Sequence, residues 1–210
     1  MSRHTIIDRV ESLRTWMRRH GISAFIFPST DPHCGEYIPD HWKAREWISG
    51  FNGSAGTAVV TLSRAALWTD SRYFLAAEEQ LKGTEFQLMR LKMEGTPTIA
   101  EWIGREIHSR QDGGGNFFTL HSSPSTSNEV GVDGMVASAN EVRRLKDELR
   151  RAGGLTLRTN FDPLKLIWKD RPPVPMNPVE VYPMEYAGES TADKLQRIRQ
   201  ALRQQHADGM

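Results

Sequence analysis

Residues 47–81 constrain the fold of this chain most strongly, because one span combines a glycine-rich turn, two short apolar runs and a helical pattern. The runs at 58–60 and 65–68 are too short for helices and are separated by polar residues, so they predict a β-hairpin. Asp70 or Ser71 is placed to cap a following helix, in which apolar residues recur every four positions up to residue 81. We expect this hairpin and helix to form the centre of the fold.

The turn before the hairpin carries Gly50, Gly53 and Gly56, which permit positive φ angles and close approach of other segments. A phosphate-binding loop needs a helix directly after its glycines, whereas a strand follows here. A nucleophile elbow needs G-x-S-x-G, and Asn52 stands two residues before Ser54 where the glycine should be. A structural turn is therefore the favoured interpretation.

Composition limits the class of protein further. The 210 residues suffice for one well-packed domain and part of another, and a net charge of +1 with interspersed signs argues against nucleic acid as the main partner. The single cysteine, Cys34, excludes an internal disulfide framework and fits a reducing compartment. The N-terminus lacks a signal-peptide pattern and no apolar run is long enough to cross a bilayer, so we expect a soluble cytoplasmic protein without a membrane partner.

Strand and helix patterns alternate along the rest of the chain. Alternation of this kind, together with the hairpin, predicts an α/β layer fold with a mixed sheet. Residues 111–128 are predicted to be a loop without chemistry. The further strands are expected at 22–27, 86–91, 130–132 and 155–157, and the further helices at 5–20, 98–110 and 138–152 and from residue 190.

Several side chains of these helices carry specific expectations. Thr5 is expected to open the first helix, and Arg14, Arg18 and Arg19 are expected to form its solvated outer face. In the helix at 138–152, a capping box is expected at Ser138 and Glu141. The apolar positions of that helix that we expect to be buried are Val142, Leu145 and Leu149.

A polar loop at 29–46 follows the first strand and is dense in reactive side chains. Asp31, His33, Cys34, Glu36 and His41 are all possible metal ligands by type, but no pair has a recognised zinc spacing. A hydrogen-bonded surface loop is therefore favoured over a metal site. Because it follows a core strand directly, the loop is still where a binding surface is expected.

The sequence changes character after residue 171. Four prolines fall within 172–178, which favours extended chain and marks a domain boundary. The helix after Ser190 places Leu195, Ile198 and Leu202 with the spacing of Val10, Leu13 and Met17 in the first helix, and both helices run into a glycine, Gly21 and Gly209. This match predicts the start of a second copy of the opening unit, and thus a piece of a longer polypeptide. We predict a domain at 1–172, a linker at 173–188 and the first helix of a second domain at 189–210.

Taken together, several stretches resemble the eukaryotic-type, three-domain aminopeptidase P, a metal-dependent Xaa-Pro aminopeptidase of the creatinase/prolidase superfamily. They cover most of the chain in the family's order. They are P-S-T-D-P-H-C-G-E-Y-I (28–38), W-I-S-G-F-N-G-S-A-G-T-A-V-V-T (47–61), L-W-T-D-S-R-Y-F-L-A-A-E-E-Q-L (67–81), G-V-D (131–133), L-I-W-K-D-R-P (166–172) and Y-A-G-E-S-T-A-D-K (186–194).

The resemblance implies a six-stranded mixed sheet flanked by helices, of ribonuclease H-like type, shared by the family's first two domains. Catalysis in the family belongs to a third domain with two metal ions, typically manganese, held by two aspartates, a histidine and two glutamates. No residue of 1–210 aligns with those ligands. The implied role is therefore a non-catalytic N-terminal domain, without a cofactor of its own and inactive alone. In the family this domain supports a homodimer and walls the active-site entrance for Xaa-Pro peptides.

The resemblance also points to the residues that would face the substrate or a subunit interface, which are Asp31, His33, Glu36, Tyr37 and Arg72. Arg72 lies in the first turn of a predicted helix, where a cation is mildly unfavourable, so it should need a carboxylate partner. Asp31 could provide one and would make the pair a clamp of the fold; this interpretation and the substrate-facing one both stay open. Trp47 and Trp68 are expected in the core.

Two alternatives to the aminopeptidase domain remain. One is a stand-alone interaction module that keeps the fold without the enzyme. The other is a hydrolase that uses Cys34 and His33, or Ser54; adjacent residues point in different directions in extended chain, which disfavours the Cys34 and His33 pair. Continuation of the natural reading frame into metal-binding motifs would separate the aminopeptidase from the interaction module.

Overall fold

The computed structural model describes residues 3–112 and 127–207. The chain divides into two compact units, Met1–Val174 and Pro175–Met210. Within the described residues, the first unit contains α1 (Arg3–His20), β1 (Ala24–Pro28), η1 (Asp40–Trp42), α2 (Ala44–Ser49), β2 (Thr57–Thr61), β3 (Ala65–Thr69), η2 (Ser71–Tyr73), α3 (Phe74–Leu81), β4 (Phe86–Arg90), α4 (Ile99–Asp112), β5 (Glu129–Val132), η3 (Gly134–Val136), α5 (Ala139–Arg151), β6 (Thr156–Arg158) and α6 (Leu164–Ile167).

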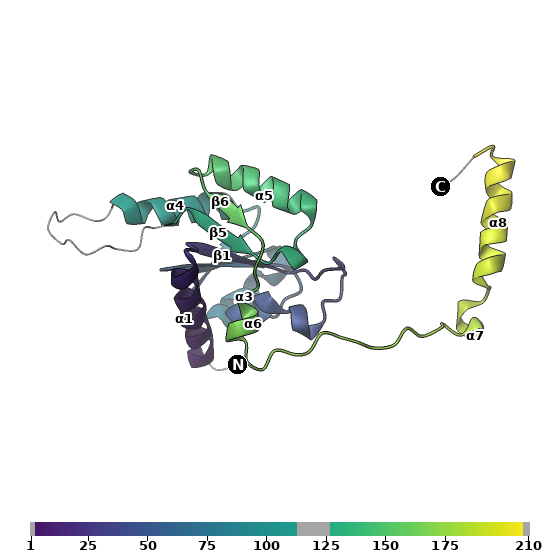
Figure 1. Ribbon diagram of the computed structural model, residues 1–210, viewed down its shortest axis with the longest axis horizontal. Helices are drawn as coiled ribbons and strands as arrows, with labels where there is room; N and C mark the ends of the chain where they lie inside the picture. The colour runs from purple at the N-terminus through teal and green to yellow at the C-terminus, as the bar shows by residue number, and fades with distance from the viewer. Residues whose placement is uncertain (1–2, 113–126, 208–210) are drawn as a thin grey trace. The chain divides into compact units, whose positions relative to one another are not determined.

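The six strands form one mixed sheet in the order β4-β3-β2-β1-β5-β6 (Figure 1). Strand β2 is antiparallel to both β1 and β3, as the predicted hairpin requires, and the remaining pairs are parallel. Consequently β1, β3, β4, β5 and β6 all end at one edge of the sheet, which we call the carboxyl edge. The predicted α/β fold with a mixed six-stranded sheet is confirmed.

Alternation along the central strands builds a core on each face of the sheet. Ala58 and Val60 of β2 pack against α1, α2, α3 and α6, whereas Val59 between them packs on the face covered by α4 and α5 (Figure 1). Trp68 is 1% exposed and meets Trp102 of α4 edge to face, with ring centroids 5.4 Å apart. The expectation that Trp47 and Trp68 belong to the core is confirmed.

The expectation that Arg14 lies on the solvated face of α1 is wrong. Its side chain is buried, its Nη2 lies 2.5 Å from Glu85 Oε2, and its Nε donates to the carbonyl of Thr61 at 3.0 Å. Arg14 falls on the helix face of Val10 and Met17, four residues before and three residues after it, so it must point at the sheet. The glutamate just before β4 compensates its charge. Arg18 and Arg19 are exposed as expected.

Several predicted boundaries also change, and the strand expected at 22–27 spans Ala24–Pro28. Helix α1 begins at Arg3, so Thr5 lies inside its first turn and is not the cap. The helix expected from residue 70 is a 3₁₀ turn, η2, followed by α3, and Asp70 caps it by accepting a hydrogen bond from the Arg72 backbone N–H. The polar loop at 29–46 contains η1 and the start of α2. Most of the predicted loop at 111–128 lies outside the described residues.

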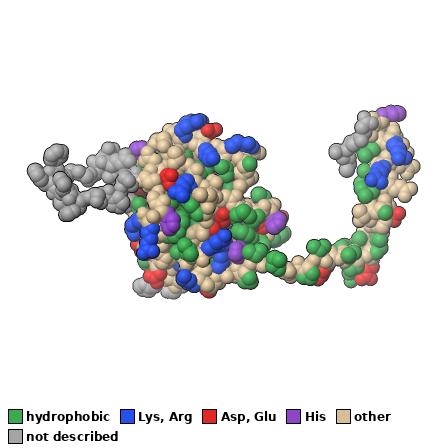
Figure 2. Space-filling view, in the orientation of Figure 1, with side chains coloured by type: hydrophobic (Ala, Val, Ile, Leu, Met, Phe, Trp, Pro, Cys, Tyr) green, Lys and Arg blue, Asp and Glu red, His purple; other side chains and the backbone are tan. Residues whose placement is uncertain are grey.

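The second unit contains α7 (Met184–Ala187) and α8 (Thr191–Gln204). Ser190 caps α8 by accepting a hydrogen bond from the Asp193 backbone N–H. No residue of α8 is buried, and Leu195 is 43% exposed. Hydrophobic side chains are also exposed along the extended segment before α7 (Figure 2). Gly209, which contributed to the predicted repeat, lies outside the described residues.

Candidate functional site

The predicted site residues flank the glycine turn at the carboxyl edge. Ser29, just after β1, donates from Oγ to the carbonyl of Gly56 at 2.7 Å. Thr69, the last residue of β3, donates from Oγ1 to the carbonyl of Ala55 at 2.6 Å. The loop that carries Asp31 and the turn that carries Arg72 are therefore tied to the same short segment.

The glycines of this turn have the structural roles expected of them. Gly50 ends α2 with φ of +77°. A Cβ on Gly53 would lie 2.3 Å from the Phe51 ring, and one on Gly56 would lie 2.8 Å from the Trp68 carbonyl oxygen. Close packing at these two positions, rather than a ligand, requires the glycines.

Arg45 of α2 binds the backbone of the glycine turn. This residue was not identified from the sequence. It is 6% exposed, donates to the carbonyls of Phe51 and Gly53, and lies over the Phe51 ring at 4.9 Å from its centroid. Burial lowers the pKa of its guanidinium to about 10, so it stays charged at neutral pH. Its position in a polar sequence segment gave no signal of burial.

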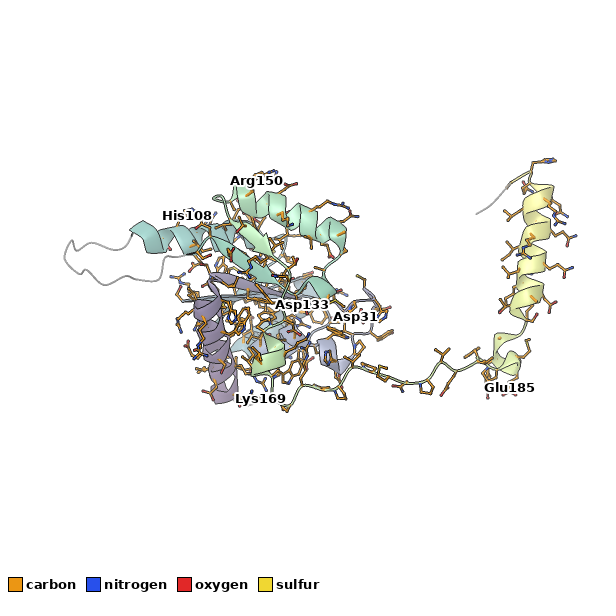
Figure 3. All side chains as sticks on the ribbon, in the orientation of Figure 1. Asp31, His108, Asp133, Arg150, Lys169 and Glu185 are labelled. Atoms are coloured by element: carbon orange, nitrogen blue, oxygen red, sulfur yellow. The ribbon has the colours of Figure 1, made fainter. Side chains whose placement is uncertain are left out.

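Asp31, which is labelled in Figure 3, forms hydrogen bonds within its own loop instead of facing solvent. The side chain is buried, and Oδ1 accepts hydrogen bonds from the backbone N–H groups of His33, at 2.9 Å, and Gly35, at 3.2 Å. The Cys34 backbone N–H donates to the Asp31 carbonyl at 3.0 Å. The loop is thus folded by one aspartate, which sets the position of the residues after it.

His33, Glu36 and Tyr37 project from this loop into solvent, and Tyr37 is 87% exposed. Within the described part of the chain, none of these three side chains makes a hydrogen bond or an ion pair. The fold therefore does not depend on their polar groups. An exposed aromatic residue beside charged neighbours is a common feature of contact surfaces.

Arg72 pairs with Asp70 and not with Asp31. Its Nε and Nη2 each lie 2.9 Å from an Asp70 carboxylate oxygen, and this guanidinium holds the pKa of the Asp70 carboxyl below its ordinary value. The expected carboxylate partner exists, but the clamp to Asp31 is wrong because Asp31 is buried and occupied by its own loop. The Arg72 side chain is 67% exposed, so the pair contributes little to stability and the guanidinium remains accessible.

Ser54 is bound to Tyr73, with 2.6 Å between the two hydroxyl oxygens, and this hydrogen bond lowers the pKa of the Tyr73 phenol. Tyr73 is the partner of Ser54 Oγ, and no histidine or carboxylate of the described residues contacts that oxygen. Nucleophilic catalysis by a serine needs such a base. The geometry gives no support to a Ser54 hydrolase.

The described residues do not fit a di-nuclear metal site. Nowhere in 3–112 or 127–207 do three His, Cys, Asp or Glu side chains lie together so that they could hold a metal ion. His41, one of the possible ligands in the polar loop, instead donates from Nδ1 to the carbonyl of Pro172 at 2.6 Å. No step that involves metal can therefore be assigned to these side chains.

A cleft of about 360 Å³ at the carboxyl edge was not expected from the sequence. Its lining includes Trp68 from the sheet, Ile99 at the start of α4, and Val142 and Leu145 of α5. The two helices touch elsewhere, where a Cβ on Gly104 would lie 2.2 Å from the Ala152 carbonyl oxygen. The predicted burial of Val142 and Leu145 is therefore wrong: both are half-buried, whereas Leu149, nearer the helix contact, is buried.

Capping boxes close the helix ends at the mouth of the cleft. In α4 the Thr98 backbone N–H donates to Glu101 Oε2 at 2.8 Å, and in α5 the Ser138 backbone N–H donates to Glu141 Oε2 at 2.9 Å. The pKa of the Glu101 carboxyl is lowered by the backbone N–H of Thr98, and that of Glu141 by the side chain and then the backbone N–H of Ser138. The predicted capping box at Ser138 and Glu141 is confirmed.

Comparison with known proteins identifies the domain. The sequence profile of the creatinase/prolidase N-terminal domain matches residues 9–158, and a second profile of the same description matches residues 170–210. The chain belongs to the creatinase/prolidase N-terminal domain family. The resemblance to this superfamily that the motifs indicated is thus confirmed.

Two relatives of known description show what the chain is similar to. The chain is 38% identical over 203 residues to a probable Xaa-Pro aminopeptidase P of Aspergillus flavus, covering 96% of this chain and 28% of that protein. It is 35% identical over 203 residues to aminopeptidase P1 of Arabidopsis thaliana, again covering 96% of this chain and 28% of the relative. The chain thus spans less than a third of the length of either relative.

A solved structure agrees with this similarity. The X-prolyl aminopeptidase of Caenorhabditis elegans, described as a cytosolic enzyme with a di-nuclear active site, matches with a TM-score of 0.71 and 28% identity over 97% of this chain and 32% of that one. In the described part of the present chain, no helix is both long and apolar enough to cross a membrane.

Proposed function

We propose that this chain acts as the non-catalytic N-terminal domain of a metal-dependent Xaa-Pro aminopeptidase, which releases the N-terminal residue from peptides with proline second. The observation that carries the proposal is the match of 96% of the chain to only 28% of a probable Xaa-Pro aminopeptidase P. The two divalent metal ions, which we expect to be manganese, would be held by residues outside 1–210.

In this role the carboxyl edge would contribute to a homodimer and to the entrance of the active site, in a cytoplasmic enzyme. The support is the exposure of His33, Glu36, Tyr37 and Arg72. They lie on both sides of a closely packed turn whose carbonyls Arg45 binds, and Asp31 fixes the loop that carries the first three. A closely packed base under exposed polar and aromatic groups favours recognition of a partner surface or a peptide.

The role predicts a sharp difference in activity between two polypeptides. The 210-residue chain should not cleave an Arg-Pro-Pro peptide even with excess manganese, because hydrolysis of this type needs metal-activated water. The polypeptide translated from the complete reading frame should cleave it, and a chelator should abolish that activity. Turnover by the repurified 210-residue chain would overturn the assignment. A reading frame that ends at Met210 would instead favour the stand-alone interaction module.

Arg72 is the residue whose loss should reduce activity in the complete enzyme. Losing one hydrogen bond to a charged group costs about 1.5–3 kcal/mol, so Arg72→Ala should lower kcat/KM by roughly ten- to a hundred-fold. Arg64→Ala is the matched control, because Arg64 is a similarly exposed arginine, 65% against 67%, with one carboxylate partner, Glu106, but lies in the turn between β2 and β3 at the opposite edge of the sheet. Arg64→Ala should leave kcat/KM unchanged.

The denaturant midpoint decides how an Arg72 effect is interpreted. An activity loss with an unchanged midpoint supports a role of the carboxyl edge at the active site. If Arg72→Ala lowers the midpoint while activity per folded molecule stays normal, Arg72 only stabilises the turn after β3. Equal activity losses in both variants would also contradict the proposed role of this edge.

A further inference from the structure

The last part of the first unit forms a strap, residues 162–172, which runs from the end of the sheet to the start of the extended chain. Its first half is anchored by apolar packing. Leu164 of α6 is 2% exposed in the core, and the Trp168 ring stacks on Trp47 with centroids 5.1 Å apart. This anchor holds α6 on the same face of the sheet as α1.

The second half of the strap is held mainly by the polar contacts of Arg171. Arg171 lies 2.5 Å from Asp162 Oδ2 through Nη1, and its Nε donates to the His41 carbonyl at 2.9 Å. The guanidinium also lies near the rings of Trp42 and Trp168, at 5.5 and 5.6 Å from their centroids. The Arg171 and Asp162 side chains are only 8% and 10% exposed, so this is a buried ion pair within the first unit.

The neighbouring residues complete this latch, which we define as Arg171, Asp162 and His41. His41 Nδ1 donates to the Pro172 carbonyl at 2.6 Å, in the opposite sense to the bond from Arg171 to the His41 carbonyl. Pro173 and Val174, which end the first unit, are both exposed. Arg171 and Pro172 are therefore the last residues of the first unit that are not exposed.

The latch can open without the anchor, because the two are held by different kinds of contact. A buried ion pair that loses one partner leaves a charge without compensation, which is strongly unfavourable. After Trp168 the strap has one backbone hydrogen bond of its own, from Arg171 N–H to the Trp168 carbonyl at 3.3 Å. An unpaired Arg171 can therefore reach water when residues 169–172 move and the hydrogen bond from His41 to the Pro172 carbonyl breaks, while Leu164 and Trp168 stay packed.

We propose that this latch, through the ion pair of Arg171 and Asp162, sets where the chain leaves the domain. With the ion pair intact, the exposed segment begins at residue 173; with the pair broken, it begins at residue 169. Four additional free residues lengthen the reach of this tether by roughly 13 Å when extended. The latch thus fixes the length of the connection to whatever follows the domain, without stabilising the sheet itself.

Two variants of the whole 210-residue chain test the latch. Asp162→Asn removes the charge but keeps an oxygen to accept the Leu164 backbone N–H, which now donates to Asp162 Oδ1 at 2.9 Å. Arg171→Met keeps an apolar stem beside the two tryptophans. Arg158→Met is the matched control, because Arg158 forms an ion pair with Glu129 at 2.8 Å and lies over the Phe161 ring, but does not hold the strap.

The readouts are trypsin cleavage after Lys169, which lies on the strap beyond α6 (Figure 3), and hydrogen exchange at the amides of residues 168 and 171. Both latch variants should raise cleavage and exchange at residue 171 by about tenfold or more, since local openings set these rates. In both latch variants, the exchange rate at residue 168 and the denaturant midpoint should stay near the values of the unsubstituted chain. All readouts of Arg158→Met should also stay near those values.

Two results would overturn the proposal. Unchanged cleavage and exchange in Asp162→Asn would show that the ion pair does not hold the strap. Faster exchange at residues 168 and 171 together, with a lower midpoint, would show that Arg171 belongs to the cooperative core. If Arg171→Met does not fold, Asp162→Asn alone decides between these outcomes.

Discussion

Helices α1 and α8 carry the same apolar spacing, yet only one of them is buried. In α1, Val10, Leu13 and Met17 are each 0% exposed under the sheet. In α8 no residue is buried, and Leu195 is 43% exposed. A local pattern and a cap are therefore enough to specify a helix, whereas burial depends on the sheet that the helix covers.

The difference extends to the ion pairs of the two units. Arg14 in the first unit is bound to Glu85 with its side chain 6% exposed, and Arg197 in the second is bound to Glu189 with its side chain 67% exposed. An arginine–glutamate pair thus lies in a largely buried environment in the first unit and in a solvated one in the second. Matched substitutions in the two units should separate what the sequence pattern specifies from what packing contributes.

The largest contrast is expected between Trp68→Ala and Leu195→Ala. Trp68 is 1% exposed, packs on Trp102 and donates from Nε1 to the Pro97 carbonyl at 2.9 Å. Its loss should lower the free energy of unfolding by about 3–5 kcal/mol. Leu195→Ala should change it by less than about 0.5 kcal/mol. Urea unfolding measures both; a cost above about 1 kcal/mol for Leu195→Ala would show that α8 packs on a surface in solution.

A smaller contrast is expected between Arg14→Met and Arg197→Met. The first leaves Glu85 half-buried without its partner and should cost about 2–3 kcal/mol. The second breaks a solvated pair and should cost at most about 1 kcal/mol, less at high salt. Thermal unfolding at low and high salt tests this; equal costs would mean that Arg14 is solvated, as the sequence had predicted.

The smallest effect is expected from removing the second unit. A chain that ends at Val181 loses α7 and α8, whose residues are not buried in the described structure. Its melting temperature should stay within about 2 °C of the full chain, because no apolar core is lost. Calorimetry on the two chains compares them directly. A drop of more than several degrees would place the segment in the core of the first domain.

Sequence patterns predicted the strands and most helices because each apolar run is flanked by turn or cap residues. The hairpin at 57–69 and the capped α5 follow from local chemistry alone. Arg14 was misplaced because helical position and residue type conflicted, and the tertiary partner Glu85, far away in the sequence, decided the outcome. Long-range pairs of this kind leave no local signal.

The candidate site shows the same limit. The residues after β1 and β3 were expected to face a substrate or a subunit interface, and in the structure both segments adjoin the glycine turn. Which of them are exposed could not be predicted, since Asp31 and Glu36 belong to one polar loop but only Asp31 is buried. The cleft between α4 and α5 depends on where two helices diverge, which no single segment encodes.

The capping boxes of α4 and α5 have a consequence for selectivity. In many α/β proteins, free amides at helix N-termini beside such a crevice attract phosphate groups. Here the carboxylates of Glu101 and Glu141 already accept hydrogen bonds at the two helix ends nearest the cleft. A nucleotide or sugar phosphate would meet these two negative charges at the helix ends, so we expect the cleft to bind phosphorylated metabolites less well than a crevice without such caps.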